Sequence, residues 1–394
     1  MNTSYRPDGT PEIVSDSAAQ SLRVTSIAFY LPQFHPGAEN DGWWGAGFTE
    51  WTNVARARPL FPGHVQPRLP GALSFYDLRL EEVRAQQGSL AARYGVSAFC
   101  YWHYWFEGRR MLEKVVDDVV QSGVPDHPFC LGWANEDWGG RWVGAPRKIL
   151  IKQTYGGDDD LRRHFDSMLP ALTDRRYLRV DGRPLVYIYR PNSLPSASRL
   201  AEIWQARASE AGLPGVFLVG QSDSHGGPWR ASPVGWDAVA PWHRTPFRAR
   251  LAVEGRSADW MLSSLSRRSR VLPAIYSYRR WSTFMPELVP GEVSIPSVLP
   301  NWDNTPRAGR AGSVFIGSTP DLFERQVERA VELAEKSEDP ALRMLFIRSW
   351  NEWAEGNYLE PDRVNGSAYL EAFRRAVTPD NVGAYLASKS PEIT

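Results

Sequence analysis

The chain has few cysteines, no long apolar run and no excess of charge of either sign. Its two cysteines, Cys100 and Cys130, each fall inside an apolar, strand-like run. We therefore expect buried thiols in a reducing compartment rather than a disulfide. No apolar run approaches the roughly 20 residues needed to span a membrane. Lys plus Arg equal Asp plus Glu at 45 each, and this balance does not favour nucleic acid or an anionic membrane as a partner.

The N-terminal segment also lacks the apolar stretch of a secretory signal. Residues 1–22 are polar and contain Pro7, Asp8 and Pro11, a composition typical of a disordered tail. The remaining length suits one barrel domain with long loops. We expect a tail over residues 1–22, a single catalytic domain over residues 23–390, and a cytoplasmic protein.

Several familiar catalytic signatures are missing. The seven histidines include no His-x-His and no pair four residues apart, which disfavours zinc peptidase or deacetylase chemistry. No Gly-x-Gly-x-x-Gly follows the first apolar run, and neither Gly-x-Ser-x-Gly nor a Walker loop is present. The acidic run at residues 158–160 is typical of a helix start rather than a calcium site. We therefore expect no metal ion and no cofactor.

Aromatic residues, in contrast, are abundant. The chain has 17 Trp, 15 Tyr and 16 Phe, and many of the Trp residues sit among turn and polar residues. A tryptophan offers a flat apolar face with a polar N–H, which suits sugar rings that have apolar C–H faces and hydroxyl rims. Each Trp alone could be a core residue, but the set favours a glycan-binding protein.

Apolar runs alternate with segments of helical periodicity along the chain. Apolar stripes at helical spacing predict helices over residues 111–120 and 323–334. Further helices are expected around residues 78–94, 159–172, 200–211 and 368–377. The eight expected strands are Thr25–Tyr30, Val96–Trp102, Pro128–Trp133, Pro184–Tyr189, Val216–Gly220, Asp237–Ala240, Ile295–Leu299 and Met344–Ser349. This alternation predicts an α/β protein of the (β/α)8 TIM-barrel class with long βα loops, with an open doubly wound sheet as the alternative.

Polar and aromatic side chains gather at the carboxyl ends of the expected strands. That end of a barrel carries the chemistry in known enzymes, so these residues are candidates for binding an oligo- or polysaccharide. The candidates are Tyr30, His35, Glu50, Trp51, Tyr101, His103, Tyr104, Trp105, Trp133, Asn135, Glu136, Tyr189, Trp242, Trp302, Asp303, Asn351 and Trp353.

Two carboxylates, Glu352 and Glu355, follow the last expected strand and are flanked by Trp350 and Trp353. Cleavage of a glycosidic bond uses two carboxyl groups, one to donate a proton and one to act as base or nucleophile. A short helix with an acidic first turn would give the same pattern without any catalytic role. Glu136 lies in a comparable strand-end position and could pair with Glu352 instead.

Six motifs together resemble the WbsX-like family over residues 24–376. They are IAFYLPQFH (27–35), WWGAGFTEWTNV (43–54), YWHYWF (101–106), WANEDW (133–138), WDNT (302–305) and WNEWAEG (350–356). That family is associated with polysaccharide and O-antigen assembly and is similar to glycoside hydrolase family 99, the endo-α-1,2-mannosidases and mannanases. The resemblance implies a (β/α)8 barrel with Glu352 as base and Glu355 as general acid.

The resemblance also implies an endo-acting, retaining hydrolase that works through a 1,2-anhydro sugar. Such a route needs a 2-hydroxyl trans to the leaving group, as in α-mannosides and α-rhamnosides. Family 99 usually has His before the second glutamate, where this chain has Ala354, and the change bears on substrate identity. A glycosyltransferase or a glycan-binding factor in polysaccharide assembly is the alternative function.

Overall fold

The structure, a computed structural model, describes residues 22–139, 149–223, 229–242, 272–283 and 288–379. Within these residues the main sheet contains eight parallel strands in the order β10-β9-β8-β4-β2-β1-β14-β12. Their bounds are β1 Thr25–Tyr30, β2 Ala98–Phe106, β4 Phe129–Trp133, β8 Arg183–Ile188, β9 Phe217–Asp223, β10 Ala238–Trp242, β12 Ser297–Val298 and β14 Met344–Ile347. A parallel bridge between Val239 and Ser294 joins the two edges. The predicted TIM-barrel class is confirmed.

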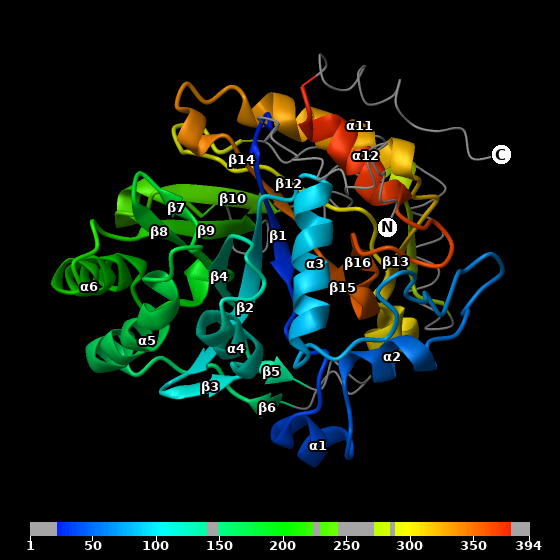
Figure 1. The fold of residues 1–394 in the computed structure, drawn as a ribbon, viewed down its shortest axis with the longest axis horizontal. Helices are drawn as coiled ribbons and strands as arrows, with labels where there is room; N and C mark the ends of the chain where they lie inside the picture. The colour runs from blue at the N-terminus through cyan, green and yellow to red at the C-terminus, as the bar shows by residue number, and fades with distance from the viewer. Residues whose placement is uncertain (1–21, 140–148, 224–228, 243–271, 284–287, 380–394) are drawn as a thin grey trace, which may run out of the picture.

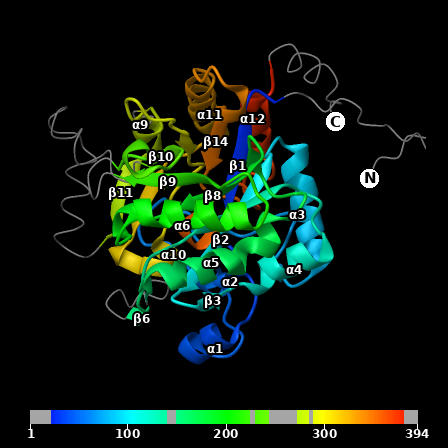
Figure 2. The same cartoon turned by 90° about the vertical axis from the view of Figure 1, so that its left-hand side faces the viewer.

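Helices cover the outside of this barrel (Figures 1 and 2). In both views α11 and α12 lie together at one end of the molecule, and α1 and α2 lie at the opposite end. The helices are α1 Ala38–Trp44, α2 Glu50–Arg56, α3 Glu81–Arg93, α4 Lys114–Ser122, α5 Gly157–Leu172, α6 Ala197–Glu210, α9 Tyr278–Trp281, α10 Thr305–Ala308, α11 Pro320–Ala334 and α12 Ala368–Val377. The six helices expected from periodicity correspond to α3, α4, α5, α6, α11 and α12.

Several short strands pair with one another within the loops between the main elements. Trp138–Gly139 (β5) pairs with Ile149–Ile151 (β6), Ala274–Ser277 (β11) with Ser313–Ile316 (β13), and Asn351–Glu352 (β15) with Asn357–Tyr358 (β16). Arg109–Met111 (β3) and Arg179–Val180 (β7) pair with the edges of β2 and β8. The β5–β6 and β15–β16 pairs are antiparallel, whereas β11 and β13 run parallel. The β15–β16 pair places Glu352 shortly after the barrel strand β14.

Residues of β2 alternate between the barrel interior and the helix layer, as the two-residue period of a strand requires. Trp102 points inward, where its ring stacks on Phe29 of β1 at 4.6 Å. Tyr187 and Phe346 complete this interior aromatic cluster. All nine residues of β2 are buried, which explains why the strand reads as one long aromatic run.

The two cysteines are neighbours across the β2–β4 ladder, where Cys100 is paired in register with Cys130. Both are free and buried, as expected. Of the expected tail, residues 1–21 lie outside the described residues, and Leu22 packs against the core. Residues 380–390 of the expected domain are likewise not described. No helix in the described part of the chain is long and apolar enough to cross a membrane.

Candidate functional site

The side chain of Arg307 joins three glutamates at the carboxyl end of the barrel. Its Nε donates to Glu50 Oε1 at 2.6 Å, and its Nη2 lies 2.9 Å from Glu352 Oε2. Its Nη1 lies 2.9 Å from Glu355 Oε1. Glu50 begins α2, Arg307 lies in α10, Glu352 ends β15, and Glu355 lies in the turn that follows. We call these four residues the acidic cluster.

Backbone contacts fix the chain on which Glu352 and Glu355 lie. Asn351 accepts a hydrogen bond from Leu31 N at 2.7 Å and donates one to Leu31 O at 3.1 Å. The loop is thereby tied to the end of β1. Gly356 adopts a φ of 66°, and a Cβ there would lie 2.8 Å from Asp303 N. Only glycine fits this close approach, which lets Asp303 N donate to Glu355 O at 2.6 Å.

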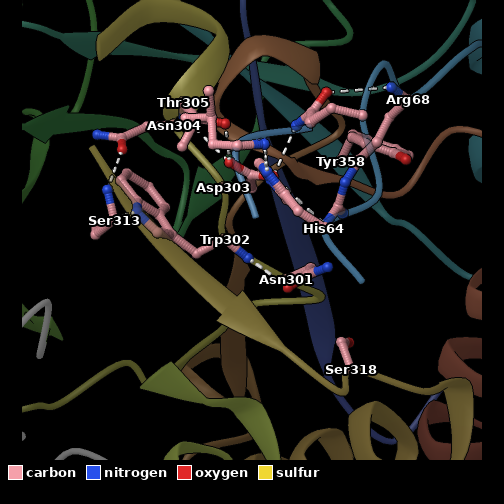
Figure 3. Close-up of polar contacts among 12 residues, drawn as sticks. His64, Arg68, Asn301, Trp302, Asp303, Asn304, Thr305, Ser313, Ser318 and Tyr358 are labelled. Carbon is pink, nitrogen blue, oxygen red and sulfur yellow. Dashed lines mark hydrogen bonds and ion pairs between the residues drawn. The ribbon is translucent and has the colours of Figure 1, made fainter. Parts of the chain in front are cut away.

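Asp303 anchors the loop that carries Arg307 (Figure 3). Its Oδ2 accepts hydrogen bonds from His64 at 2.8 Å and Gln66 at 2.7 Å, and its Oδ1 accepts from the Thr305 hydroxyl at 2.6 Å. The residue is fully buried. Burial alone would raise its pKa, but the His64 hydrogen bond, the charge of Arg68 and the other donors hold it below the usual range. Both oxygens are therefore engaged by the protein, in a supporting position.

The three glutamates of the cluster differ in exposure. The side chain of Glu50 is 0% exposed and that of Glu352 is 9% exposed, whereas that of Glu355 is 25% exposed. Glu355 is therefore the member most open to an incoming molecule, with Glu352 behind it. Three carboxylates around one guanidinium leave an excess of negative charge if all ionise.

This arrangement changes the proton affinity of the buried members. Burial raises the pKa of Glu352 to about 8; the charge and hydrogen bond of Arg307 oppose this shift, and repulsion from Glu355 and Glu50 adds to it. Burial also raises the pKa of Glu50 against the same attraction. The carboxylates in turn raise the pKa of Arg307 against its own burial, so its charge is fixed. Near neutral pH the cluster stores a proton, chiefly on Glu352.

Tyr104 stands on the interior side of β2 near these carboxylates. Burial, followed by the negative charge of Glu352, raises the pKa of its hydroxyl, which therefore stays protonated. Its ring packs edge-on against Trp138 at 4.9 Å. A neutral phenol beside a carboxylate is a hydrogen-bond donor and acceptor suited to a sugar hydroxyl.

Glu136 and its neighbours form a separate group. The Glu136 side chain is 48% exposed and pairs with Arg190 at 3.1 Å. Asn135 accepts from Arg190 N at 2.7 Å and donates to Tyr155 at 3.1 Å. The guanidinium of Arg190 lies 4.6 Å from the centroid of the Tyr189 ring. No contact between Glu136 and Glu352 is found among the described residues.

Five of the candidate residues lie between the strands and the helices. Tyr30 donates to Gln87 of α3 at 2.6 Å, and Trp105 donates to Asp160 of α5 at 3.2 Å. His103 Nε2 lies 2.9 Å from His164 Nε2 of α5, and burial lowers the pKa of His103 to about 3. The other two of the five are Tyr101, against Phe129, and Trp133, against His164 and Trp204. Strand alternation turns all five away from the barrel interior.

The remaining aromatic candidates support the loops around the cluster. Trp51 donates to Tyr76 O at 2.8 Å, and its ring lies 5.6 Å from that of Trp353. Trp353 donates to Glu360 at 2.6 Å, and Trp302 donates to the Ser313 hydroxyl at 2.9 Å. These contacts hold the turns after β14 and β12 in place.

Two candidates remain to be located. His35 is buried, with Nδ1 2.8 Å from Pro36 O and with no hydrogen-bond partner for its buried Nε2 within the described ranges. Trp242 ends β10, and its side chain lies outside what the structure describes. In the parts of the chain that are described, no group of three or more His, Cys, Asp or Glu is placed to hold a metal ion.

Sequence reasoning missed Arg307 and Trp102. Arg307 lies two residues after the WDNT motif. No local pattern indicates that its side chain contacts Glu50, which lies 257 residues earlier in the chain. Trp102 lies in the YWHYWF motif, whose composition alone does not show which of its side chains face the barrel interior. The alternation of β2 is the signal that would have placed Trp102 and Tyr104 inside and their neighbours outside.

Comparison with known proteins gives consistent relatives. The family described as "Glycosyltransferase WbsX" matches residues 26–373. Two strains of Xanthomonas campestris pv. campestris, B100 and ATCC 33913, each have an "Uncharacterized protein WxcX" that is 38% identical over 96% of this chain. The chain spans about half, 52%, of the length of those relatives.

Two solved structures share the fold at low sequence identity. One is a "Glycoside hydrolase-like protein" with a TM-score of 0.56 and 13% identity, covering 90% of this chain and 94% of the other. The second is a GH99 endo-alpha-mannosidase from Bacteroides thetaiotaomicron, in complex with BIS-TRIS-propane. It has a TM-score of 0.53 and 16% identity, covering 93% of this chain and 98% of the other. At these identities the likeness establishes a common fold.

Proposed function

Because the chain belongs to the WbsX family, and its fold is shared with a family-99 mannosidase, we propose that it is an endo-acting, retaining glycoside hydrolase. The substrate class is a bacterial polysaccharide with α-mannoside- or α-rhamnoside-type linkages. The observation that carries the proposal is the acidic cluster, in which Glu352 and Glu355 share one guanidinium at the carboxyl end of the barrel. That pairing supplies two carboxyl groups in different environments, as glycoside cleavage requires.

In the proposed first step Glu352 removes the proton of the sugar 2-hydroxyl, and the oxygen attacks C1. The bond from C1 to the glycosidic oxygen breaks, and that oxygen takes the proton of Glu355. A 1,2-anhydro sugar results. In the second step a water attacks C1 and gives its proton to Glu355, while the opening epoxide oxygen takes the proton held by Glu352. Two inversions at C1 retain the anomeric configuration, and both glutamates return to their starting states.

Exposure and charge agree with this division of labour in part. Glu355, the more exposed of the two, is better placed to reach a leaving oxygen on the solvent side. Glu352 is deeper, and its raised pKa of about 8 makes its carboxylate a stronger base once ionised. The same shift means that Glu352 holds a proton near neutral pH in the free protein, so the proposed step requires this proton to pass to Glu355 when the substrate binds. Activity is therefore expected to fall as the pH rises through about 8, where the pair loses this proton.

Tyr104 and Arg307 have supporting roles in the proposal. The neutral Tyr104 phenol near Glu352 is suited to hold a hydroxyl of the reacting sugar. Arg307 holds both carboxylates in one geometry and stabilises whichever of them is ionised. We assign Tyr30, Tyr101, His103, Trp105 and Trp133 to the support of the rim, since they face the helices.

A product screen tests the activity directly. Wild type, Glu352→Gln, Glu355→Gln and the surface control Glu332→Gln would be incubated with α-mannans, rhamnans and O-antigen fragments, without nucleotide sugar, and followed by mass spectrometry. New oligosaccharides are expected from wild type and Glu332→Gln alone. Products that form only after a nucleotide sugar is added would instead make the protein a transferase.

A second comparison tests the acid. Loss of general acid catalysis costs about 10²–10⁴ in rate, and substrates with good leaving groups need the acid least. We expect Glu355→Gln to lose most on the unactivated glycan and least on an aryl glycoside with a good leaving group. Equal losses on the two substrates would contradict the assignment of Glu355 as acid.

A further inference from the structure

A cavity of about 210 Å³ lies beside the acidic cluster. Its walls come from the loop after α2, the turn after β12, strand β13 and the segment between β16 and α12. Glu50, Arg307, Glu352 and Glu355 do not line it, although Gly356 does. Asp303 and its hydrogen bonds separate the two sites, because His64 and Arg68 on the cavity side both approach its carboxylate. Figure 3 shows the cavity residues Arg68, Tyr358, Asn301 and Ser318 around this partition.

Three polar side chains in the cavity wall keep hydrogen-bonding capacity. Asn301 Oδ1 accepts from Trp302 N at 2.8 Å, which leaves its Nδ2 as a donor. Asn365 Nδ2 donates to Asp362 at 3.0 Å, which leaves its Oδ1 as an acceptor. Arg68 also lines the cavity, and its side chain is 16% exposed, so its guanidinium presents further donors. This mixture of donors and acceptors matches hydroxyl groups, each of which can both donate and accept.

The charges around the cavity favour a neutral ligand. Arg68 Nη2 lies 3.9 Å from Asp303 Oδ2, so its positive charge is largely balanced from behind. Asp362, in the wall, accepts hydrogen bonds from Tyr358 at 2.9 Å and from Val364 N at 2.9 Å. A phosphate or carboxylate would meet this second acidic group as well as the arginine. A polyhydroxylated ligand without charge avoids that repulsion.

The rim of the cavity is apolar and exposed. Val65 is 56% exposed, Ile316 45% and Val364 75%, and all three line the cavity. The ring of Phe315, which is buried, lines it as well. Apolar surface around a polar floor suits a molecule whose faces carry C–H groups and whose edge carries hydroxyls.

We propose that this cavity is a second glycan site, which binds one neutral pyranose unit beside the acidic cluster. The choice of a glycan over another neutral polyol rests on the proposed function, because a polysaccharide substrate brings many such units to the surface. Asn301, Asn365 and Arg68 hold the hydroxyls, and the apolar rim contacts the sugar face. A site of this kind keeps a long chain on the enzyme while another part of it is cleaved.

The test observes the cavity itself and needs no turnover. The 394-residue chain would be labelled in its Ile, Leu and Val methyl groups and titrated with methyl α-D-mannopyranoside or methyl α-L-rhamnopyranoside. We expect the methyl signals of Val65, Ile316 and Val364 to shift, whereas those of Leu80, exposed outside the cavity lining, stay in place. Inorganic phosphate, the charged probe, is expected to leave all of them unmoved.

Substitutions then tie these shifts to the proposed contacts. Asn301→Asp keeps the acceptor for Trp302 N and removes the donor, and Asn365→Ala removes the acceptor. Together they are expected to weaken the binding at least tenfold. Asn304→Asp is the matched control, since that side chain is turned to Ser313 N at 2.7 Å and does not line the cavity.

Each outcome has a separate meaning for the two sites. The proposal of a second site would be wrong if neither glycoside shifted the methyl signals of Val65, Ile316 and Val364, or if these shifts persisted unchanged in the double variant. Either result holds whether or not the glycan is cleaved. Shifts that follow the substitutions, in a protein that cleaves no glycan, would support the second site and refute the proposed activity. Shifts with phosphate alone would show an anion site instead.

Discussion

Removing the guanidinium at the centre of the acidic cluster should destabilise the protein strongly and in a pH-dependent way. Arg307→Met keeps an unbranched side chain but removes the guanidinium. The ion pairs to Glu50, Glu352 and Glu355, at 2.6, 2.9 and 2.9 Å, are then lost. Breaking a buried pair typically costs about 3–5 kcal/mol, because a charge is left uncompensated in a site shielded from water. Loss of the pair with the partly exposed Glu355 adds at most about 1 kcal/mol to this cost. This loss is a large part of the roughly 5–15 kcal/mol that stabilises a typical domain.

The dependence on pH follows from the sign of the glutamate shifts. Burial raises the pKa of Glu50 and Glu352 in the folded protein, and loss of Arg307 should raise both further. A group with a raised folded-state pKa favours folding at low pH, where it is protonated, and loses that contribution as the pH rises through the folded-state value. The free energy of unfolding of Arg307→Met should therefore be lower than that of wild type by about 3–5 kcal/mol at pH 8 and by only about 1–3 kcal/mol at pH 5.

Urea unfolding of both proteins at the two pH values measures this difference. Arg375→Met is the matched control, because that arginine is 54% exposed and pairs with Glu324 on the surface. It should cost no more than about 1 kcal/mol at either pH. A loss in Arg307→Met of less than about 1 kcal/mol, or one of the same size at pH 5 and pH 8, would refute the view that this guanidinium offsets buried negative charge.

Three further expectations follow from the structure, two at the acidic cluster and one at the buried His127. Because the first step needs one proton on the Glu352–Glu355 pair, kcat/KM should fall as the pH rises through about 8, and a pH–rate profile that rises there would contradict a proton shared by this pair. Gly356→Ala forces a Cβ to within 2.8 Å of Asp303 N, so thermal unfolding should reveal a loss of about 1–3 kcal/mol, and kcat should fall. Burial lowers the pKa of His127 to about 4, so its favourable contribution is present above pH 6.5 and is lost as the pH falls. When the pH falls from 7 to 4.5, the free energy of unfolding measured in urea should therefore decrease by about 2 kcal/mol less in His127→Phe than in wild type. Equal decreases in the two proteins would contradict this.

The barrel could be predicted because its strands carry their own signal. Runs such as Thr25–Tyr30 are buried on both faces, and a parallel sheet covered by helices requires nearly continuous apolar residues. The strand β12 is shorter than the expected Ile295–Leu299. Pro296 has no N–H to donate to the ladder, a limit on pairing that the apolar pattern alone does not reveal.

The site was only partly predictable from the sequence. The motif after β14 indicated Glu352 and Glu355 from local order alone, and the structure joins them through Arg307. The arginine could not be found in this way, because its contact depends on the paths of two loops that are distant in sequence. Position at a strand end also indicated His103 and Trp133 as ligand-binding residues. Both face the helices, because side chains alternate along a strand and only every second one faces the barrel interior.

The distance along the chain between the members of the acidic cluster affects how the protein is made. Glu50 leaves the ribosome 257 residues before the arginine that will compensate it. At about 5–20 residues per second, the interval is on the order of tens of seconds. Through that time Glu50 must remain hydrated, since a lone carboxylate is too costly to bury. The mouth of the barrel is thus expected to close late in synthesis, after the strands that surround it have begun to pair.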